Sequence, residues 1–186
     1  FSGVMGILKK MIDDLRSMIE TIQTGNFNAR VAEDAYKGEY LQIVQGINQT
    51  VDTFSKDFDQ LTTPVLTIDK DFTIRYMSEA GAKLTGIPQN ELVGKKCYDV
   101  FRTDDCGTEN CACRQAMQSK SNVERETTAR PGDQELEIRY LGTPILKDDE
   151  VVGAFEVITD LTEIKKAKSE AEHQAQALTA LLTDVN

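Results

Sequence analysis

The sequence predicts an α+β sheet domain held between helical segments at both ends of the chain. Both ends carry apolar residues at alternating intervals of three and four, the heptad pattern of helices that pack along their length. The middle instead contains short runs of β-branched and aromatic residues separated by turn sequences. We therefore divide the chain into a helix–connector–helix segment at 1–61, a sheet domain at 62–162 and a C-terminal signalling helix at 163–186.

The first segment predicts two helices joined by a connector at about 25–38. The first helix is expected to end near Gly25-Asn26, because both residues favour helix C-termini. Two helices with one apolar seam each are most simply satisfied by a four-helix bundle in a parallel homodimer. The first seam comprises Met5, Leu8, Ile12, Leu15, Ile19 and Ile22, and the second comprises Tyr40, Val44, Ile47, Val51, Phe54, Phe58 and Leu61.

The C-terminal segment carries a third, thinner seam in which alanines replace several large residues. Lys168 occupies one of its core positions, which costs stability and helps to fix the register of a coiled coil. The alternative for all three seams is ordinary packing inside a compact domain. Their placement on both sides of a sheet domain favours a linear dimeric relay. The third seam comprises Leu161, Ile164, Ala171, Ala175, Leu178, Leu182 and Val185.

The middle segment predicts five antiparallel strands with short helices on one face of the sheet. A domain of this size buries a modest core and one small pocket. In chain order, the expected elements are strands at 65–68 and 72–77, helices at 79–84, 91–101 and 113–120, and strands at 123–129, 136–146 and 151–159.

Several motifs of this middle segment resemble those of PAS sensor domains. Pro64–Asp69 resembles the opening strand and turn, and Phe72–Ala82 the second strand and first short helix, with Ser78 where many members have Asn. The passage with Gly86, Glu91, Leu92 and Gly94 resembles a usual passage of the family. Residues 141–145 resemble its long fourth strand, and residues 152–154 its fifth strand. The exit Asp160-Leu161-Thr162 resembles the family's signal-transfer motif, which implies that Asp160 and Thr162 tie the core to the outgoing helix.

The first segment resembles a HAMP domain. Residues 25–31 fit the connector pattern of a glycine followed by two spaced apolar residues. The resemblance implies that Gly25 begins the connector, that Phe27 and Val31 plug the bundle, and that Glu39 is the acidic residue that opens the second helix.

The four cysteines of the chain are its one chemically unusual feature. Cys97, Cys106, Cys111 and Cys113 have the spacing C-x8-C-x4-C-x-C. In a reducing compartment clustered thiolates favour metal over disulfides, so the four residues are candidate ligands for zinc or an iron–sulfur cluster. Redox-active thiols are one alternative, and inert packing of Cys97 and Cys113 is another. Haem ligation is disfavoured, because no C-x-x-C-H motif is present and the only histidine, His173, lies beyond the sheet domain.

Composition excludes several classes of function. A net charge of −10 disfavours nucleic acid as a partner, and no apolar run approaches the ~20 residues that cross a bilayer. No Gly-rich phosphate loop or serine nucleophile motif is present, so we do not expect an enzyme. The chain begins at Phe1 within a running heptad pattern, and we expect it to be a piece of a longer protein.

The two resemblances together imply a sensory and signal-relay module of a transmembrane receptor. They imply the cytoplasmic portion of an inner (plasma) membrane receptor of the methyl-accepting chemotaxis type, in which a small-ligand, metal or redox signal passes through dimeric helices to a downstream domain of the same chain. Any membrane anchor would lie outside this sequence. The alternatives are the sensor module of a histidine kinase or cyclase, or a PAS domain that acts only as a dimerisation spacer.

Overall fold

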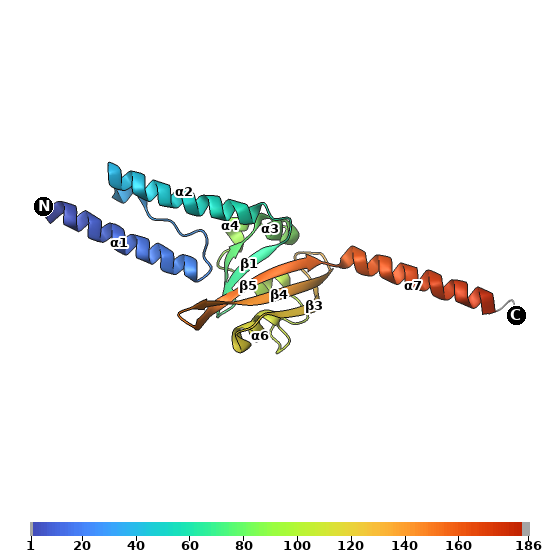
Figure 1. Cartoon of the computed structure of the whole chain (residues 1–186). Coiled ribbons are helices and arrows are strands. Elements are labelled where there is room, and N and C mark those ends of the chain that lie inside the picture. The colour runs from blue at the N-terminus through green and yellow to red at the C-terminus, as the bar shows by residue number, and fades with distance from the viewer. Residues whose placement is uncertain (1, 184–186) are drawn as a thin grey trace.

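The computed structural model describes residues 2–183, with long helices on both sides of a central sheet domain (Figure 1). Helices α1 (Ser2–Gln23) and α2 (Glu39–Asp59) lie side by side and run in the same direction. Helix α7 (Thr162–Thr183) leaves the sheet on the opposite side, so the two ends of the chain are far apart. Val185 of the third predicted seam lies outside the described residues.

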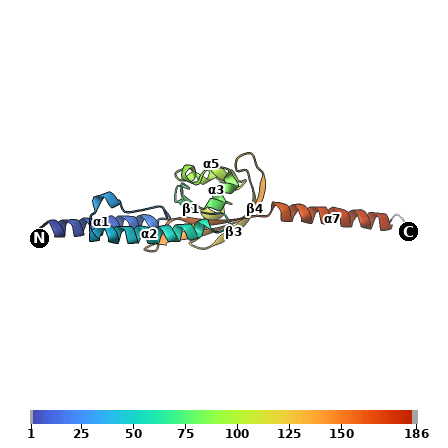
Figure 2. The ribbon, with the colours of Figure 1, turned by 90° about the horizontal axis from the view of Figure 1, so that it is seen from above.

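The central sheet has the five antiparallel strands that the sequence predicts. They are β1 (Val65–Asp69), β2 (Ile74–Met77), β3 (Val123–Ala129), β4 (Leu136–Lys147) and β5 (Glu150–Asp160). Their spatial order is β2-β1-β5-β4-β3, which places the last strand in the centre. The short helices lie on one face of this sheet (Figure 2).

Four short helices connect β2 to β3, one more than predicted. They are α3 (Glu79–Thr85), α4 (Gln89–Leu92), α5 (Cys97–Phe101) and α6 (Ala112–Ser119). The single helix predicted at 91–101 is wrong. The backbone of Ile74 donates to Lys95 and accepts from Gly94, and these bonds to the sheet interrupt the helix. At the start of α3, the Ser78 hydroxyl accepts from the N–H of Gly81 and so caps the helix.

The contact between α1 and α2 differs from the predicted seams. Met11 and Met18 are the buried residues of α1, and they pack with Val31, Tyr36 and Val44. Four residues of the first predicted seam are exposed instead. A helix with a broad apolar stripe has room for two neighbours, and within one chain only one side of the stripe is covered. The exposed residues are Met5 at 67%, Leu8 at 36%, Ile12 at 46% and Ile19 at 50%.

The main core lies between the sheet and its short helices. It contains large side chains that are fully buried, and burial of each contributes about 1.5–3 kcal/mol. Among them are Leu66, Ile68, Ile74, Met77, Leu92, Ile138 and Ile158. No helix in the described part of the chain is both long and apolar enough to cross a membrane.

We predict that Gly142→Ala destabilises the domain by about 1–3 kcal/mol. A methyl group at this position of β4 would stand 2.9 Å from backbone atoms of Ala112 and Cys113 in α6. The matched control is Gly46→Ala in α2, where no atom lies within 4 Å and stability should rise by about 0.5–1 kcal/mol. Urea unfolding measures both changes. Equal effects of the two substitutions would contradict the close packing of α6 on β4.

Candidate functional site

The sequence-predicted cysteines gather around one cavity on the helical side of the sheet. The cavity has a volume of about 260 Å³, and Cys97, Cys106 and Cys111 contribute to its wall. Its other lining residues are Phe72, Tyr98, Gly107 and Arg114. We call this cavity the thiol pocket. The fold thus brings three of the four predicted site residues to one space, whereas Cys113 lies behind the wall and is 1% exposed.

Each cysteine is positioned by a different local structure. Cys97 begins α5, and Cys111 stands at the residue before α6. Cys106 lies in the loop between these helices, where the backbone N–H of Thr103 donates to its sulfur at 3.2 Å. All four cysteines are free thiols.

A buried carboxyl group, Glu156 of β5, lies next to the cysteines. Its side chain points to the inner face of the sheet, and Cys113 Sγ donates to Glu156 Oε2 at 3.1 Å. Residue 142 is paired with Glu156 in the sheet, and the missing side chain of Gly142 lets the backbone of α6 approach closely enough for this contact. Sequence reasoning missed Glu156. The available signal was an acidic residue at an inward position of the apolar run Val151–Ile158.

Burial and charge keep these groups protonated. Burial raises the pKa of all four thiols, and Glu156 raises the pKa of each of them further where its carboxyl group is ionised. Burial also raises the pKa of Glu156 from 4.5 to about 7, although the hydrogen bond from Cys113 acts in the opposite direction. The raised pKa values keep these thiols in the neutral, protonated form.

Arg114 supplies the only guanidinium group at the thiol pocket. Its guanidinium carbon lies 5.0 Å from the centre of the Phe72 ring, a cation–π contact. Its Nε is buried without a hydrogen-bond partner, and Arg114 makes no ion pair with any residue that the structure describes. A buried donor without an acceptor is unfavourable, and the cation–π contact with Phe72 is the one stabilising contact of the guanidinium group that the structure shows.

The cysteines do not form a ready-made metal site. Among residues 2–183, no group of three or more histidine, cysteine, aspartate or glutamate side chains is arranged so that it could hold a metal ion.

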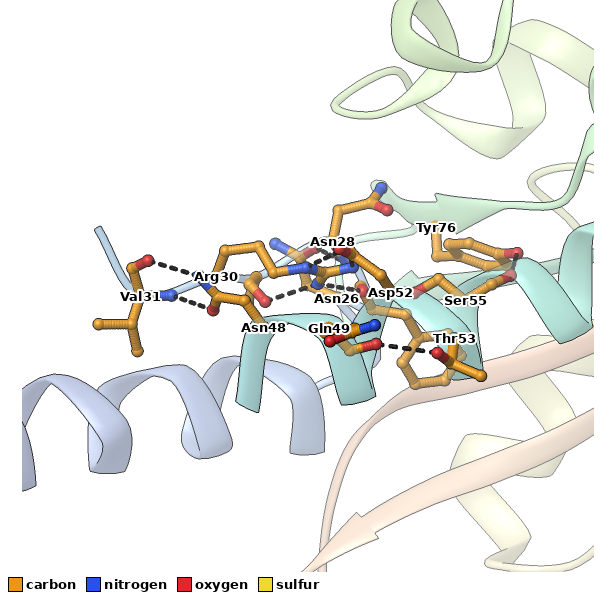
Figure 3. A network of polar contacts seen from close by, with 12 residues as sticks. Asn26, Asn28, Arg30, Val31, Asn48, Gln49, Asp52, Thr53, Ser55 and Tyr76 are labelled. Carbon is orange, nitrogen blue, oxygen red and sulfur yellow. Dashed lines mark hydrogen bonds and ion pairs between the residues drawn. The ribbon is translucent and has the colours of Figure 1, made fainter. Parts of the chain in front are cut away.

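The connector between α1 and α2 forms a second polar network (Figure 3). The Asn48 amide accepts from the N–H of Val31 at 3.0 Å and donates to its carbonyl at 2.9 Å. Arg30 pairs with Asp52 at 2.8 Å. Val31 is 4% exposed and packs between the helices, and α2 begins at Glu39 as predicted.

That Phe27 plugs a bundle stays a prediction, and within one chain Phe27 also reaches the sheet. Its ring packs on Phe54 and Phe58 of α2 and on Tyr76 of β2, at centroid distances of 5.2–5.6 Å. The reason lies at Gly25, whose φ of +90° turns the chain onto the sheet, where Thr67 Oγ1 donates to its carbonyl at 2.7 Å. The connector is therefore fastened to the outer face of the sheet.

The exit motif fastens α7 to the sheet. Thr162 N–H donates to Asp160 Oδ1 at 2.8 Å, and Thr162 Oγ1 accepts from the N–H of Glu137 in β4 at 3.0 Å. Lys165 of α7 donates to the carboxylate of Glu137 at 2.9 Å, and this contact lowers the pKa of Glu137. The two residues that the sequence singled out thus stand at the junction of strand and helix.

Residues 58–166 match the family model described as the PAS fold, and the match spans more than half of the chain. The chain therefore belongs to the PAS fold family. No curated protein shows a significant match.

Solved structures agree with this assignment. The PAS domain of a protein from Colwellia psychrerythraea is 17% identical with a TM-score of 0.55, over 61% of this chain and 98% of that chain. The PAS domain of an HTR-like protein from Haloarcula marismortui is 14% identical with a TM-score of 0.52, over 64% and 98%. A PAS domain from a two-component sensor histidine kinase is 12% identical with a TM-score of 0.52, over 61% and 98%. At these identities the likeness shows the fold alone.

We predict that Glu156→Gln changes the pH dependence of stability. The folded carboxyl stays protonated up to about pH 7, whereas the unfolded one ionises near 4.5. This difference in pKa contributes about 3 kcal/mol to the free energy of unfolding. The whole contribution is present below pH 4.5 and is lost as the pH rises toward 7. Glutamine cannot ionise, so the variant should gain this amount relative to the wild type between about pH 4.5 and 7.5. Urea unfolding at a series of pH values measures both proteins. If the free energy of unfolding depends on pH in the same way in the wild type and in Glu156→Gln, Glu156 is not buried as described.

Proposed function

We propose that this chain is a sensory and signal-relay module in which the state of a PAS pocket controls the packing of dimeric helices. It acts by changing conformation and not by catalysing a reaction. The observation that carries the proposal is the set of exposed apolar side chains at heptad positions on helices at both ends of the PAS domain. Large apolar side chains at regular spacing on an exposed helix face are typical of a protein interface.

A second copy of the same chain is the proposed partner of these faces. Met5, Leu8, Ile12 and Ile19 are exposed residues of α1 that α2 does not cover. Because α1 and α2 are parallel, two copies related by a two-fold axis form a four-helix bundle of the HAMP type. On α7, Ile164 and Leu178 are 65% and 60% exposed and lie two heptads apart, which suits a parallel coiled coil.

Strand β5 is the proposed route from the pocket to the helices. On the inner face of β5, Glu156 contacts Cys113. On its outer face, the ring of the neighbouring Phe155 packs on the ring of Phe58 in α2, with the two ring centroids 6.1 Å apart. The strand ends at Asp160, directly before α7. A shift of β5 therefore reaches both helix systems, and two discrete packings of the helices are all that a switch requires.

The parent protein in this proposal is a membrane receptor of the methyl-accepting chemotaxis type, with this chain in its cytoplasmic portion ahead of an output domain. The HAMP-like segment, which carries signals from a membrane-spanning part, favours this class. A histidine kinase or a cyclase is the second candidate, since PAS domains of two-component sensor histidine kinases share the fold. A passive dimerisation spacer is the third.

We predict that Ile12→Lys weakens the homodimer at least about tenfold, because a charge at a buried interface position costs more than 1.4 kcal/mol. The control is Asp13→Lys, which introduces the same side chain at the next position, on another face of α1, and should leave the dimer unchanged. Sedimentation equilibrium measures both dissociation constants. A wild-type chain that stays monomeric at high concentration would contradict the proposed dimeric relay.

We predict that Thr162→Val loosens the first turn of α7. The substitution removes the acceptor of the Glu137 N–H, and a lost hydrogen bond of about 1 kcal/mol accelerates local opening roughly fivefold. Hydrogen exchange of the α7 amides should show this acceleration. Thr159→Val, at an exposed position on β5, is the control and should leave α7 as it is. Unchanged exchange in both variants would mean that Thr162 does not couple the helix to the sheet.

A further inference from the structure

We propose that Asp59, the last residue of α2, is a latch that couples the movement of α2 to strand β2 and, through β2, to the wall of the thiol pocket. This rests on the proposed relay and deepens it, because it adds a second connection between helix and pocket that does not pass through β5. Asp59 is a positioning residue in this role, since its carboxylate holds the end of α2 against three other elements of the PAS domain.

The latch consists of three hydrogen bonds to one carboxylate oxygen. Asp59 Oδ1 accepts from the hydroxyl of Tyr76 in β2 at 2.9 Å. The same atom accepts from the backbone N–H of Glu79, the first residue of α3, at 3.1 Å, and from the side-chain amide of Gln89, the first residue of α4, at 3.0 Å. Hydrogen bonds to a charged acceptor are stronger than those between neutral groups, so the three contacts hold the end of α2 in place.

The position of Asp59 in its own helix makes these contacts necessary. A negative charge at the C-terminal end of a helix is unfavourable, because that end of the helix dipole is also negative. At the start of α3 the same charge is favourable, and the N–H of Glu79 needs an acceptor from outside its helix. The favourable interactions of the Asp59 carboxylate therefore depend on α2 and α3 staying together.

Tyr76 lies at the centre of this junction. Its side chain is fully buried, and its ring packs on Phe27 of the connector and Phe58 of α2, at centroid distances of 5.2 and 6.2 Å. Burial and the neighbouring Asp59 carboxylate raise the pKa of Tyr76, so its hydroxyl stays protonated and remains a donor. A rotation or shift of the last turn of α2 therefore either breaks the hydrogen bond to Tyr76 or moves β2 with the helix.

Strand β2 connects the latch to the thiol pocket. It lies at the edge of the sheet, where β1 is its one partner strand. The backbone of Ile74 donates to the carbonyl of Lys95 and accepts from the N–H of Gly94, both at 2.8 Å. Directly before β2, the carbonyl of Phe72 accepts from the N–H of Cys97 at 2.9 Å. Phe72 and Cys97 both line the thiol pocket, so a displacement of β2 moves two parts of its wall.

The test measures how fast iodoacetamide alkylates each cysteine of the reduced chain, with mass spectrometry as the readout. Asp59→Ala should raise the rate at Cys97 roughly fivefold, because the release of β2 lets the pocket wall open more often. Cys113, whose thiol is held by Glu156, should react at the wild-type rate. The matched control is Asp57→Ala, which removes an exposed carboxylate from the same turn of α2 and should change neither rate.

Two further variants show whether the hydrogen bonds themselves matter. Asp59→Asn keeps an oxygen acceptor at this position and should stay within about twofold of the wild-type rate at Cys97. Gln89→Ala removes one of the three donors and leaves the carboxylate in place, so it should raise the rate at Cys97 by less than Asp59→Ala does. It also keeps the test decisive if circular dichroism shows that Asp59→Ala does not fold.

Two results would overturn the proposal. The first is an unchanged rate at Cys97 when the latch is broken. The second is an equal rise at Cys97 and Cys113, which would mean that Asp59 contributes only to general stability. Sedimentation of the same samples separates this proposal from the relay. A monomeric chain contradicts the relay, whereas the alkylation rates test contacts that lie within one chain.

Discussion

Helix α6 rests directly on strand β4 at Gly142, and most of the proposed mechanism depends on this contact. Helix α6 brings Cys113 to Glu156 and places Cys111 and Arg114 in the wall of the thiol pocket. A side chain at residue 142 would lift the helix and separate these groups. A packing constraint of the fold therefore also decides which thiols share a cavity and which one is held by a carboxyl group.

The central position of β5 gives this pocket a mechanical connection to the rest of the chain. Successive side chains of a strand point to opposite faces, so Glu156 and Phe155 contact the pocket side and the α2 side respectively. The connector adds a second attachment through Gly25 and Phe27. Signals on either face of the sheet thus act on the same strand, which ends where α7 begins.

The sequence was sufficient for the fold because local patterns determine it. The runs of β-branched and aromatic residues, the turn at Asp69 and the heptads at both ends correspond to observed elements. The contact of Phe27 with Tyr76 was not predicted because it joins residues far apart in sequence, which no local pattern reports. Glu156 and Arg114 were missed for the same reason. Each is unremarkable in sequence and becomes functional only through burial beside the cysteines, whose clustering alone was visible.

The central claim is that the state of the thiol pocket reaches the helices through β5. Its most direct test is hydrogen exchange of the reduced chain before and after alkylation of the pocket thiols, in the wild type and in a variant with serine in place of Cys97, Cys106 and Cys111. The account predicts altered exchange in β5, at the C-terminal end of α2 and in the first turn of α7, in the wild type only. Changes confined to the loop at 102–111, with β5 and both helices unaffected, would contradict it.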